Sequence, residues 1–111
     1  MRGMKLTCLV SERTTLETAK EAIQNAAGIL VVVDRGRRLL GVVTPGDIAR
    51  ARQEGLSPSS GVRAFMNPKP KTAPAGKRRR VYFDLLKKWN VRQIPIVDRT
   101  RRVKDLVHIY E

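Results

Sequence analysis

The sequence contains little of several residue types, and each shortage excludes a class of protein. Cys8 is the single cysteine among 111 residues, so the chain can form no internal disulfide and no cysteine-based metal site. Aromatic residues make up only 5% of the chain. The longest apolar run, Ala26 to Val33, is far shorter than the ~20 residues that cross a bilayer. We therefore expect no membrane span, no signal peptide and a cytoplasmic location.

Acidic residues are also scarce, with 10 against 23 basic ones, which gives a formal net charge of +13. The excess is uneven, because residues 1–55 carry nine basic and six acidic groups (+3) and residues 56–111 carry fourteen and four (+10). Such a balance favours an anionic partner. The alternative is that the basic side chains only solvate turns and helix faces.

An internal repeat is the main organising feature of the sequence. Residues 31–40 align with residues 95–104 at a constant offset of 64. Each copy begins with an apolar strand and a charged turn opened by Asp. A second strand follows, over residues 39–43 in the first copy and 103–109 in the second. The pattern therefore predicts the same hairpin twice.

A segment with helical period precedes each hairpin, with apolar residues three or four positions apart. These residues are Leu16, Ala19, Ile23 and Ala26 in the first copy and Tyr82, Leu85, Leu86 and Trp89 in the second. Ser11, Thr14 and Thr15 are possible caps of the first helix, which should end near Gly28. We also expect a strand over residues 6–10, with Cys8 as a small buried group.

A third helix is predicted after the first hairpin, running to about Glu54. Thr44 is its expected N-cap, Pro45 occupies its first position and Asp47 its third, and Gly55 stops it. The purely structural interpretation of this turn is a helix cap and nothing more.

The chain therefore divides into two repeats that together form one compact module. Residues 1–55 are predicted to be the first repeat, and residues 56–111 a Pro-rich connector followed by the second repeat. The connector should contain an extended piece around residues 69–73. The second copy ends immediately after its last strand, without a final helix. We expect that the sequence is cut from a longer protein, with another domain following Glu111.

This arrangement resembles a tandem CBS-domain pair, also called a Bateman module. The likeness is carried by Ile29 to Asp34, Gly41-Val42-Val43-Thr44-Pro45-Gly46-Asp47-Ile48, Phe65 to Pro70, and Val91 to Asp98. It implies an α/β fold of tandem β-α-β-β-α repeats with pseudo-two-fold symmetry, the last helix of the second repeat being missing. Two of these stretches, residues 43–48 and 92–95, are similar to the CBS pair in front of some bacterial sugar-phosphate nucleotidyltransferases.

The resemblance implies a regulatory module that senses an adenine nucleotide (AMP, ADP or ATP) or S-adenosylmethionine. It also implies a homodimer and an attached C-terminal catalytic domain, for which a nucleotidyltransferase is the narrower expectation. The chain itself is not expected to be an enzyme, because paired carboxylates, a Ser-His-Asp order and a phosphate-binding glycine loop are absent from the sequence. No metal is expected.

The predicted ligand site centres on the turn from Thr44 to Asp47. Helix amides behind Thr44 would attract a phosphate, and Gly46 would allow close approach. An ionised carboxylate at Asp47 could accept ribose hydroxyls. Family comparison gives Thr44 and Asp47 these roles. The flat base would lie against an apolar wall of Ile29, Leu30 and Val31.

Only one such site is predicted, because the second repeat has Asp105, His108 and Glu111 where the first has Gly41, Thr44 and Asp47. Arg78 and Arg79 are possible countercharges for a polyphosphate.

Two other functions stay open. One is a dimerisation module without a ligand. The other is electrostatic nucleic-acid binding through residues 77–80 and 99–102, which the scarcity of aromatics and the lack of a nucleic-acid-binding motif disfavour.

Overall fold

The structure is a computed structural model that describes residues 8–26 and 28–108. Its elements follow one another as β1 (Leu9–Ser11), α1 (Leu16–Ala22), the 3-10 turn η2 (Ile23–Asn25), β2 (Leu30–Val33), β3 (Leu39–Val43), α2 (Pro45–Gln53), the 3-10 turn η3 (Val62–Ala64), β4 (Ala73–Pro74), α3 (Arg79–Trp89), β5 (Gln93–Val97) and β6 (Val103–His108). They form two three-stranded sheets, β1-β2-β3 and β4-β5-β6. In each sheet a parallel first strand lies beside an antiparallel hairpin.

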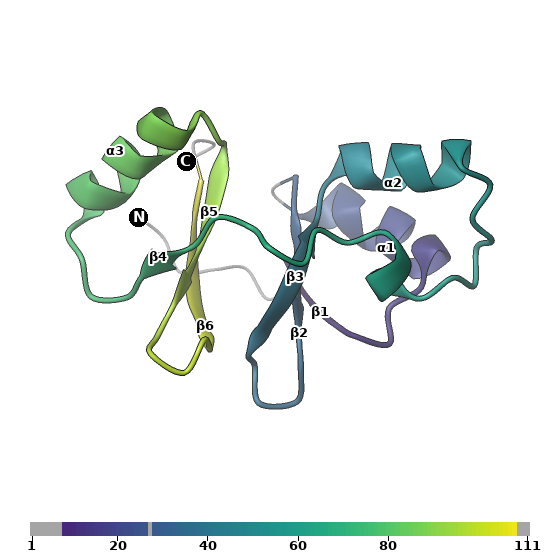
Figure 1. The fold of residues 1–111 in the computed structure, drawn as a ribbon, viewed down its shortest axis with the longest axis horizontal. Coiled ribbons are helices and arrows are strands. Elements are labelled where there is room, and N and C mark those ends of the chain that lie inside the picture. Colours follow the sequence, from purple (N-terminus) through teal and green to yellow (C-terminus); the bar gives the residue numbers. More distant parts are fainter. Residues whose placement is uncertain (1–7, 27, 109–111) are drawn as a thin grey trace.

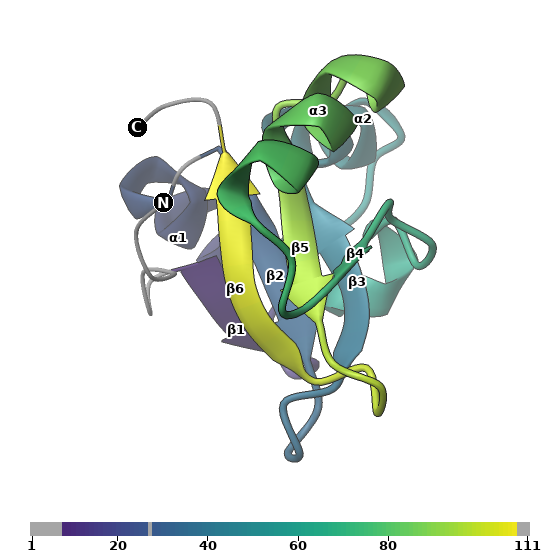
Figure 2. The ribbon, with the colours of Figure 1, turned by 90° about the vertical axis from the view of Figure 1, so that its left-hand side faces the viewer.

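The two sheets face each other in the middle of the molecule, and the helices cover their outer faces (Figure 1). Helices α1 and α2 cover the first sheet and α3 covers the second. Seen from the side of α3, the β5–β6 hairpin lies in front of the first sheet (Figure 2). This is the mixed α/β arrangement of tandem β-α-β-β-α repeats that the sequence analysis predicted.

Alternation along the strands divides the apolar residues among three cores. On β2, Leu30 and Val32 face α1 and α2, whereas Val31 faces the second sheet. The core between the sheets draws on both repeats and consists of Cys8, Ile29, Val31, Leu39, Val42, Val97, Val103 and Leu106. A third core lies under α3. Because the middle core needs residues from both repeats, neither sheet is fully covered by its own repeat.

The repeat seen in the sequence is also present in the backbone of the hairpin turns. Asp34 and Asp98 each bond through their backbone N–H to the carbonyl oxygen four residues on, Arg38 and Arg102, at 3.0 Å. The strand register also shifts at the same place in both hairpins, between residues 32 and 33 and between residues 96 and 97. The offset of 64 therefore describes a three-dimensional symmetry.

Two reciprocal hydrogen bonds join the hairpins across this symmetry axis. The amide of Leu39 donates to the carbonyl of Arg101, and the amide of Val103 donates to the carbonyl of Arg37, both at 2.9 Å. Exchanging the repeats turns one bond into the other, because the donors Leu39 and Val103 are 64 residues apart and so are the acceptors Arg37 and Arg101. We call this pair of bonds the hairpin clasp.

The helix boundaries agree with the expected caps. Thr15 is the N-cap of α1 and forms a capping box with Thr18. Thr44 is the N-cap of α2, Pro45 opens that helix, and Gly55 follows it with a φ of +79°. The first helix ends with the η2 turn ahead of Gly28, which also has a φ of +79°.

Two predicted extended segments differ from the structure, and a third is described only in part. The first strand is Leu9–Ser11 rather than residues 6–10, since Cys8 lies in a helical turn just before it. The extended connector piece contributes only Ala73–Pro74 to the second sheet, because only there does it pair with β5. The last strand is described to His108, and Ile109 lies outside the described residues.

Candidate ligand pocket between the repeats

A pocket of about 470 Å³ opens between the two repeats at the end of the strands opposite the hairpin clasp. Its volume lies in the ~300–1,000 Å³ range of small-molecule sites. It is lined by Gly28, Ile29, Val42, Thr44, Pro45, Asn67, Pro70, Lys71, Val91, Arg92, Gln93 and Pro95. The first repeat, the connector and the second repeat therefore all contribute to it.

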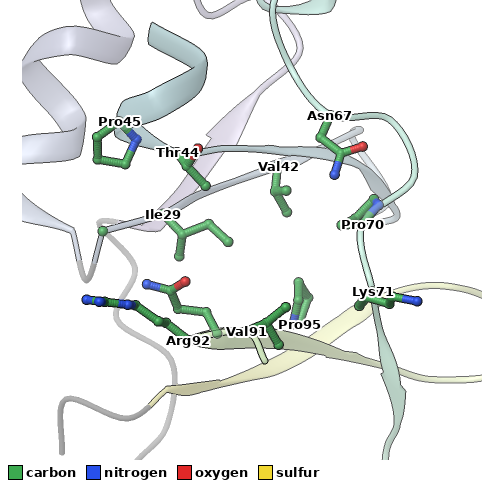
Figure 3. Close-up of a pocket in the computed structure, with 12 residues that line it drawn as sticks. Ile29, Val42, Thr44, Pro45, Asn67, Pro70, Lys71, Val91, Arg92 and Pro95 are labelled. Atoms are coloured by element: carbon green, nitrogen blue, oxygen red, sulfur yellow. The ribbon is translucent and has the colours of Figure 1, made fainter. Parts of the chain in front are cut away.

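Apolar side chains face each other across the pocket (Figure 3). Ile29 and Val42 come from the ends of β2 and β3, and Val91 and Pro95 lie opposite them on the second repeat. Ile29 and Val42 are only 4% and 5% exposed, so each presents a small part of a well-packed side chain to the pocket. A flat, apolar group would fit between these walls.

The connector closes one side of the pocket because it pairs with β3. Val42 and Asn67 exchange backbone hydrogen bonds of 3.0 and 2.8 Å. This contact places Asn67, Pro70 and Lys71 along the rim. Lys71 holds its ammonium 5.4 Å from the centroid of the Trp89 ring. Figure 3 shows Lys71 and Arg92 at opposite ends of the pocket, so positive charge is present at both ends.

Thr44 reaches the pocket from the start of α2, where three of the first four backbone positions are already accounted for. Pro45 has no N–H, the amide of Asp47 donates to Thr44 Oγ1 at 3.4 Å, and the amide of Ile48 donates to the Thr44 carbonyl at 3.2 Å. Within the described chain, the amide of Gly46 is the one of these four positions whose N–H is not used by the cap. The helix end thus offers one donor beside the pocket.

Asp47 lies behind Thr44 and is only 9% exposed. Its Oδ2 accepts from the Thr44 amide at 2.9 Å and from Thr44 Oγ1 at 3.1 Å, and its Oδ1 pairs with Arg50. These partners form the capping box and do not line the pocket. A ribose contact by Asp47 would have to share a carboxylate that the helix start already uses.

The other residues expected at the site are placed elsewhere. Leu30 and Val31 are completely buried, one under the helices and one between the sheets, and neither lines this pocket; their role as a wall for a base stays a prediction. Gly46 is exposed, and a Cβ there would meet nothing closer than Thr44 Oγ1 at 3.8 Å, so close approach does not require glycine. Of the expected apolar wall, Ile29 alone lines the pocket.

Arg78 and Arg79 are also outside the pocket lining. They begin α3, and the Arg79 guanidinium lies 5.4 Å from the centroid of the Phe83 ring. Their placement does not support a role as countercharge in this pocket. The basic residues that do line the pocket are Lys71 and Arg92.

Most of the remaining lining residues lie in stretches that carry the resemblance to CBS-domain pairs, but they have no predicted role of their own. The stretches 65–70 and 91–98 contain Asn67, Val91 and Arg92. What could not be read from the sequence is that the connector returns to the edge of β3 and brings these stretches together. The repeat symmetry itself was the available signal, since it places the start of β5 opposite the start of β2.

The second repeat offers a different set of groups at the equivalent place. His108 is half-buried at the end of β6, and Glu111 lies outside the described residues. The expectation of a single site of the Thr44 kind stays a prediction. Among residues 8–26 and 28–108, no group of three His, Cys, Asp or Glu side chains is placed to hold a metal ion. In the same ranges, every helix is too short or too polar to span a bilayer.

Comparisons with known proteins agree with this fold. Residues 9–54 match the family model described as the CBS domain. A CBS domain protein from Pyrobaculum aerophilum, PAE2072, solved in complex with AMP, superposes with a TM-score of 0.79 at 20% identity, over 98% of this chain and 82% of that one. A putative acetoin utilization protein from Vibrio cholerae, AcuB, superposes with a TM-score of 0.84 at 16% identity, over 96% of this chain and 79% of that one.

A third similar structure is the CBS domain pair of protein MJ0100 in complex with 5′-methylthioadenosine and S-adenosyl-L-methionine. It has a TM-score of 0.77 at 23% identity, over 96% of this chain and 84% of that one. At these identities the likeness establishes the fold. The sequence matches none of the curated proteins with which it was compared.

Proposed function

We propose that this chain, whose residues 9–54 are a CBS domain and whose fold is that of a tandem CBS-domain pair, is a regulatory module that binds an adenine-containing ligand between its repeats. The observation that carries the proposal is the pocket lined by both repeats and the connector. A ligand there would contact all three segments at once. It could therefore favour one arrangement of the repeats over another, which is what regulation requires.

The apolar walls suit the adenine ring. Ile29 and Val42 on one side and Val91 and Pro95 on the other leave a space for a flat group, and nearby backbone groups can contact its edge. Similar folds hold AMP in PAE2072 and two adenosine derivatives in MJ0100. The shared adenosine part is the ligand feature that we assign to these walls.

The polar end of the ligand would lie near the start of α2 or near the rim cations. The spare amide of Gly46 and the positive end of α2 attract an oxygen-rich group. Lys71 and Arg92 add positive charge. These groups fit the phosphate of AMP, ADP or ATP, and they distinguish such ligands from the cationic sulfonium of S-adenosylmethionine.

In this proposal the module acts on a partner, as the resemblance to CBS-domain pairs implies. We assign residues 1–55 to the first repeat and residues 56–111 to the connector and second repeat, together one module. We further propose that it works as a homodimer in the cytoplasm and controls an attached enzyme, with a sugar-phosphate nucleotidyltransferase as the narrower candidate. Nucleotide-dependent change in the activity of the full-length protein would test this last step.

Titration calorimetry of the chain with AMP, ATP, adenosine and S-adenosylmethionine tests the binding proposal. We expect saturable heat for at least one adenine ligand. Val91→Phe should weaken every adenine ligand by at least about tenfold, since the larger ring fills the pocket. The matched control is Val81→Phe, because Val81 is 41% exposed on α3 and lies outside the pocket lining. No heat with any ligand, or equal loss in both variants, would contradict the proposal and favour a ligand-free dimerisation module.

A second pair of variants tests the phosphate. Arg92→Gln should weaken AMP and ATP while leaving adenosine unchanged. The control Arg52→Gln removes one positive charge from the exposed surface of α2, away from the pocket. If Arg92→Gln weakened adenosine as much as AMP, the guanidinium would not be a phosphate partner.

A further inference from the structure

Six arginines gather at the end of the molecule opposite the pocket. They occupy the turns of the two hairpins and are all exposed: Arg35, Arg37, Arg38, Arg99, Arg101 and Arg102. Figure 1 shows both turns at the same end of the strands, and the hairpin clasp confirms that they are neighbours. An isolated bridge pairs Arg38 with Arg102. We call this surface the arginine end.

The acidic residues in these turns do not neutralise the arginine end. Asp34 Oδ1 accepts from the amide of Arg38 at 2.8 Å, and Asp98 Oδ1 accepts from the amide of Arg102 at 2.9 Å, so both carboxylates are used inside their own turns. Asp98 also pairs with Lys104 at 3.9 Å. In the described part of the chain, none of the six guanidinium groups forms an ion pair. Six positive and two negative charges leave a net +4 in residues 34–38 and 98–102.

Two of these arginines have an unfavourable backbone conformation. Arg37 and Arg101 have φ angles of +67° and +70°, a region that glycine adopts freely and other residues rarely do. The clasp bonds accept at the carbonyls of these same two residues. Arginine at strained, symmetry-related positions, crowded by like charges, indicates a requirement other than stability.

The chemistry of the surface favours phosphate over an acidic protein. Guanidinium groups form bidentate hydrogen bonds with phosphate, and all six cations here are arginine. A docking surface for a protein usually has an apolar centre, whereas the two turns, residues 34–38 and 98–102, contain no large hydrophobic residue. The two turns also contain no aromatic side chain for stacking on single-stranded bases.

We propose that the arginine end binds the phosphate backbone of a nucleic-acid duplex without reading its sequence. The pseudo-two-fold relation between the turns suits a duplex, because the two strands of a duplex are themselves related by two-fold axes. This surface is separate from the pocket. The proposal therefore does not depend on nucleotide binding.

Fluorescence anisotropy with two short labelled duplexes of unrelated sequence tests the proposal between about 50 and 200 mM salt. We expect equal affinity for both sequences and a steep salt dependence. The variant Arg35→Gln, Arg37→Gln, Arg99→Gln, Arg101→Gln should weaken binding at least about tenfold. It should also reduce the magnitude of the slope of log K against log salt by up to about 3.6, since each of four phosphate contacts contributes ~0.9.

The matched control removes the same charge from the surface at and before α3, as Lys77→Gln, Arg78→Gln, Arg80→Gln, Lys88→Gln. It should change affinity less than about threefold. Thermal melting shows whether each variant is folded. Equal loss in both variants would show that binding follows net charge alone and would overturn the proposal, as would no binding at low salt. Displacement of the duplex by polyglutamate at equal charge would point to an acidic protein partner instead and would also overturn it.

Discussion

Gly41 illustrates how one residue can decide the course of the connector. A Cβ at this position would lie 2.7 Å from the carbonyl oxygen of Asn67 and 2.8 Å from the sulfur of Met66. The Asn67 carbonyl cannot easily withdraw, because it accepts from the amide of Val42. The sequence analysis treated Gly41 as part of a ligand-binding motif. The structure shows that Gly41 allows the connector backbone to approach β3.

Gly41→Ala should therefore lower the free energy of unfolding by about 1–3 kcal/mol, the usual cost of overpacking. Urea denaturation measures the change. Gly61→Ala is the matched control, because its Cβ would meet nothing within 4 Å. That variant should be neutral or slightly more stable. Equal destabilisation in both would show that the approach of the connector is not the cause.

Asp98 shows how two matching turns can differ in electrostatics. Hydrogen bonds from the Thr100 side chain and from the backbone of Arg102 and Thr100, together with the charge of Lys104, hold the pKa of Asp98 below its ordinary value of 3.8. The Thr100 hydroxyl lies 2.8 Å from Asp98 Oδ1. In the first repeat the equivalent residue is Gly36, which has no side chain to donate.

Because the pKa of Asp98 is lowered on folding, its contribution to stability is present above the ordinary pKa and is lost as the pH falls through the lowered one. Thr100→Gly should move the pKa of Asp98 upward, toward 3.8. Titration of the Asp98 carboxyl followed by NMR checks this. Thr100→Ser, which retains the hydroxyl, should leave the pKa low. An unchanged pKa in Thr100→Gly would exclude the side-chain bond as its main cause.

At the scale of elements, the start of α2 combines a helix cap with part of the pocket wall. Thr44 and Asp47 satisfy each other through a capping box, and Thr44 also lines the pocket. The sequence predicted this helix well because local chemistry determines it: a capping threonine, a proline at the first position and a glycine after the end. It predicted the pocket less well, since the walls come from segments far apart in the chain.

Thr44→Ala should cost about 0.5–2 kcal/mol of unfolding free energy through loss of the cap. Thr44→Ser keeps the hydroxyl and should remain within about 0.5 kcal/mol of the natural protein. Thermal and urea denaturation distinguish the two. If serine were as damaging as alanine, the methyl group in the pocket wall would matter more than the capping oxygen.

The strand boundaries were harder to predict than the helix starts. The apolar run before α1 contains residues that could extend a strand in either direction, and pairing with β2 selects Leu9–Ser11. Likewise the apolar run Leu30-Val31 suggested one wall for a base. In a strand, neighbouring side chains face opposite sides, so the two residues enter different cores.

At the scale of the whole molecule, the core between the sheets makes the two repeats depend on each other. Leu39 from the first repeat and Val103 from the second are 3% and 1% exposed within it. Neither repeat could bury these residues alone. The internal repeat predicted two similar units, but it did not predict the core that they share.

Leu39→Ala should lower the free energy of unfolding of the whole chain by about 2–5 kcal/mol, as for other buried leucines. Trp89 is the single tryptophan and reports on the second repeat, although Leu39 belongs to the first. The fluorescence and far-UV circular dichroism transitions should therefore shift together. Separation of the two transitions would show that the repeats unfold independently.

The hairpin clasp also restricts how the repeats can move. Sliding one repeat past the other would break both of its hydrogen bonds, whereas a small rotation about the clasp could keep them. In such a rotation the residues near the clasp move least, and those at the pocket end of the strands move most. A ligand bound between Ile29 and Val91 would thus set the angle between the two repeats.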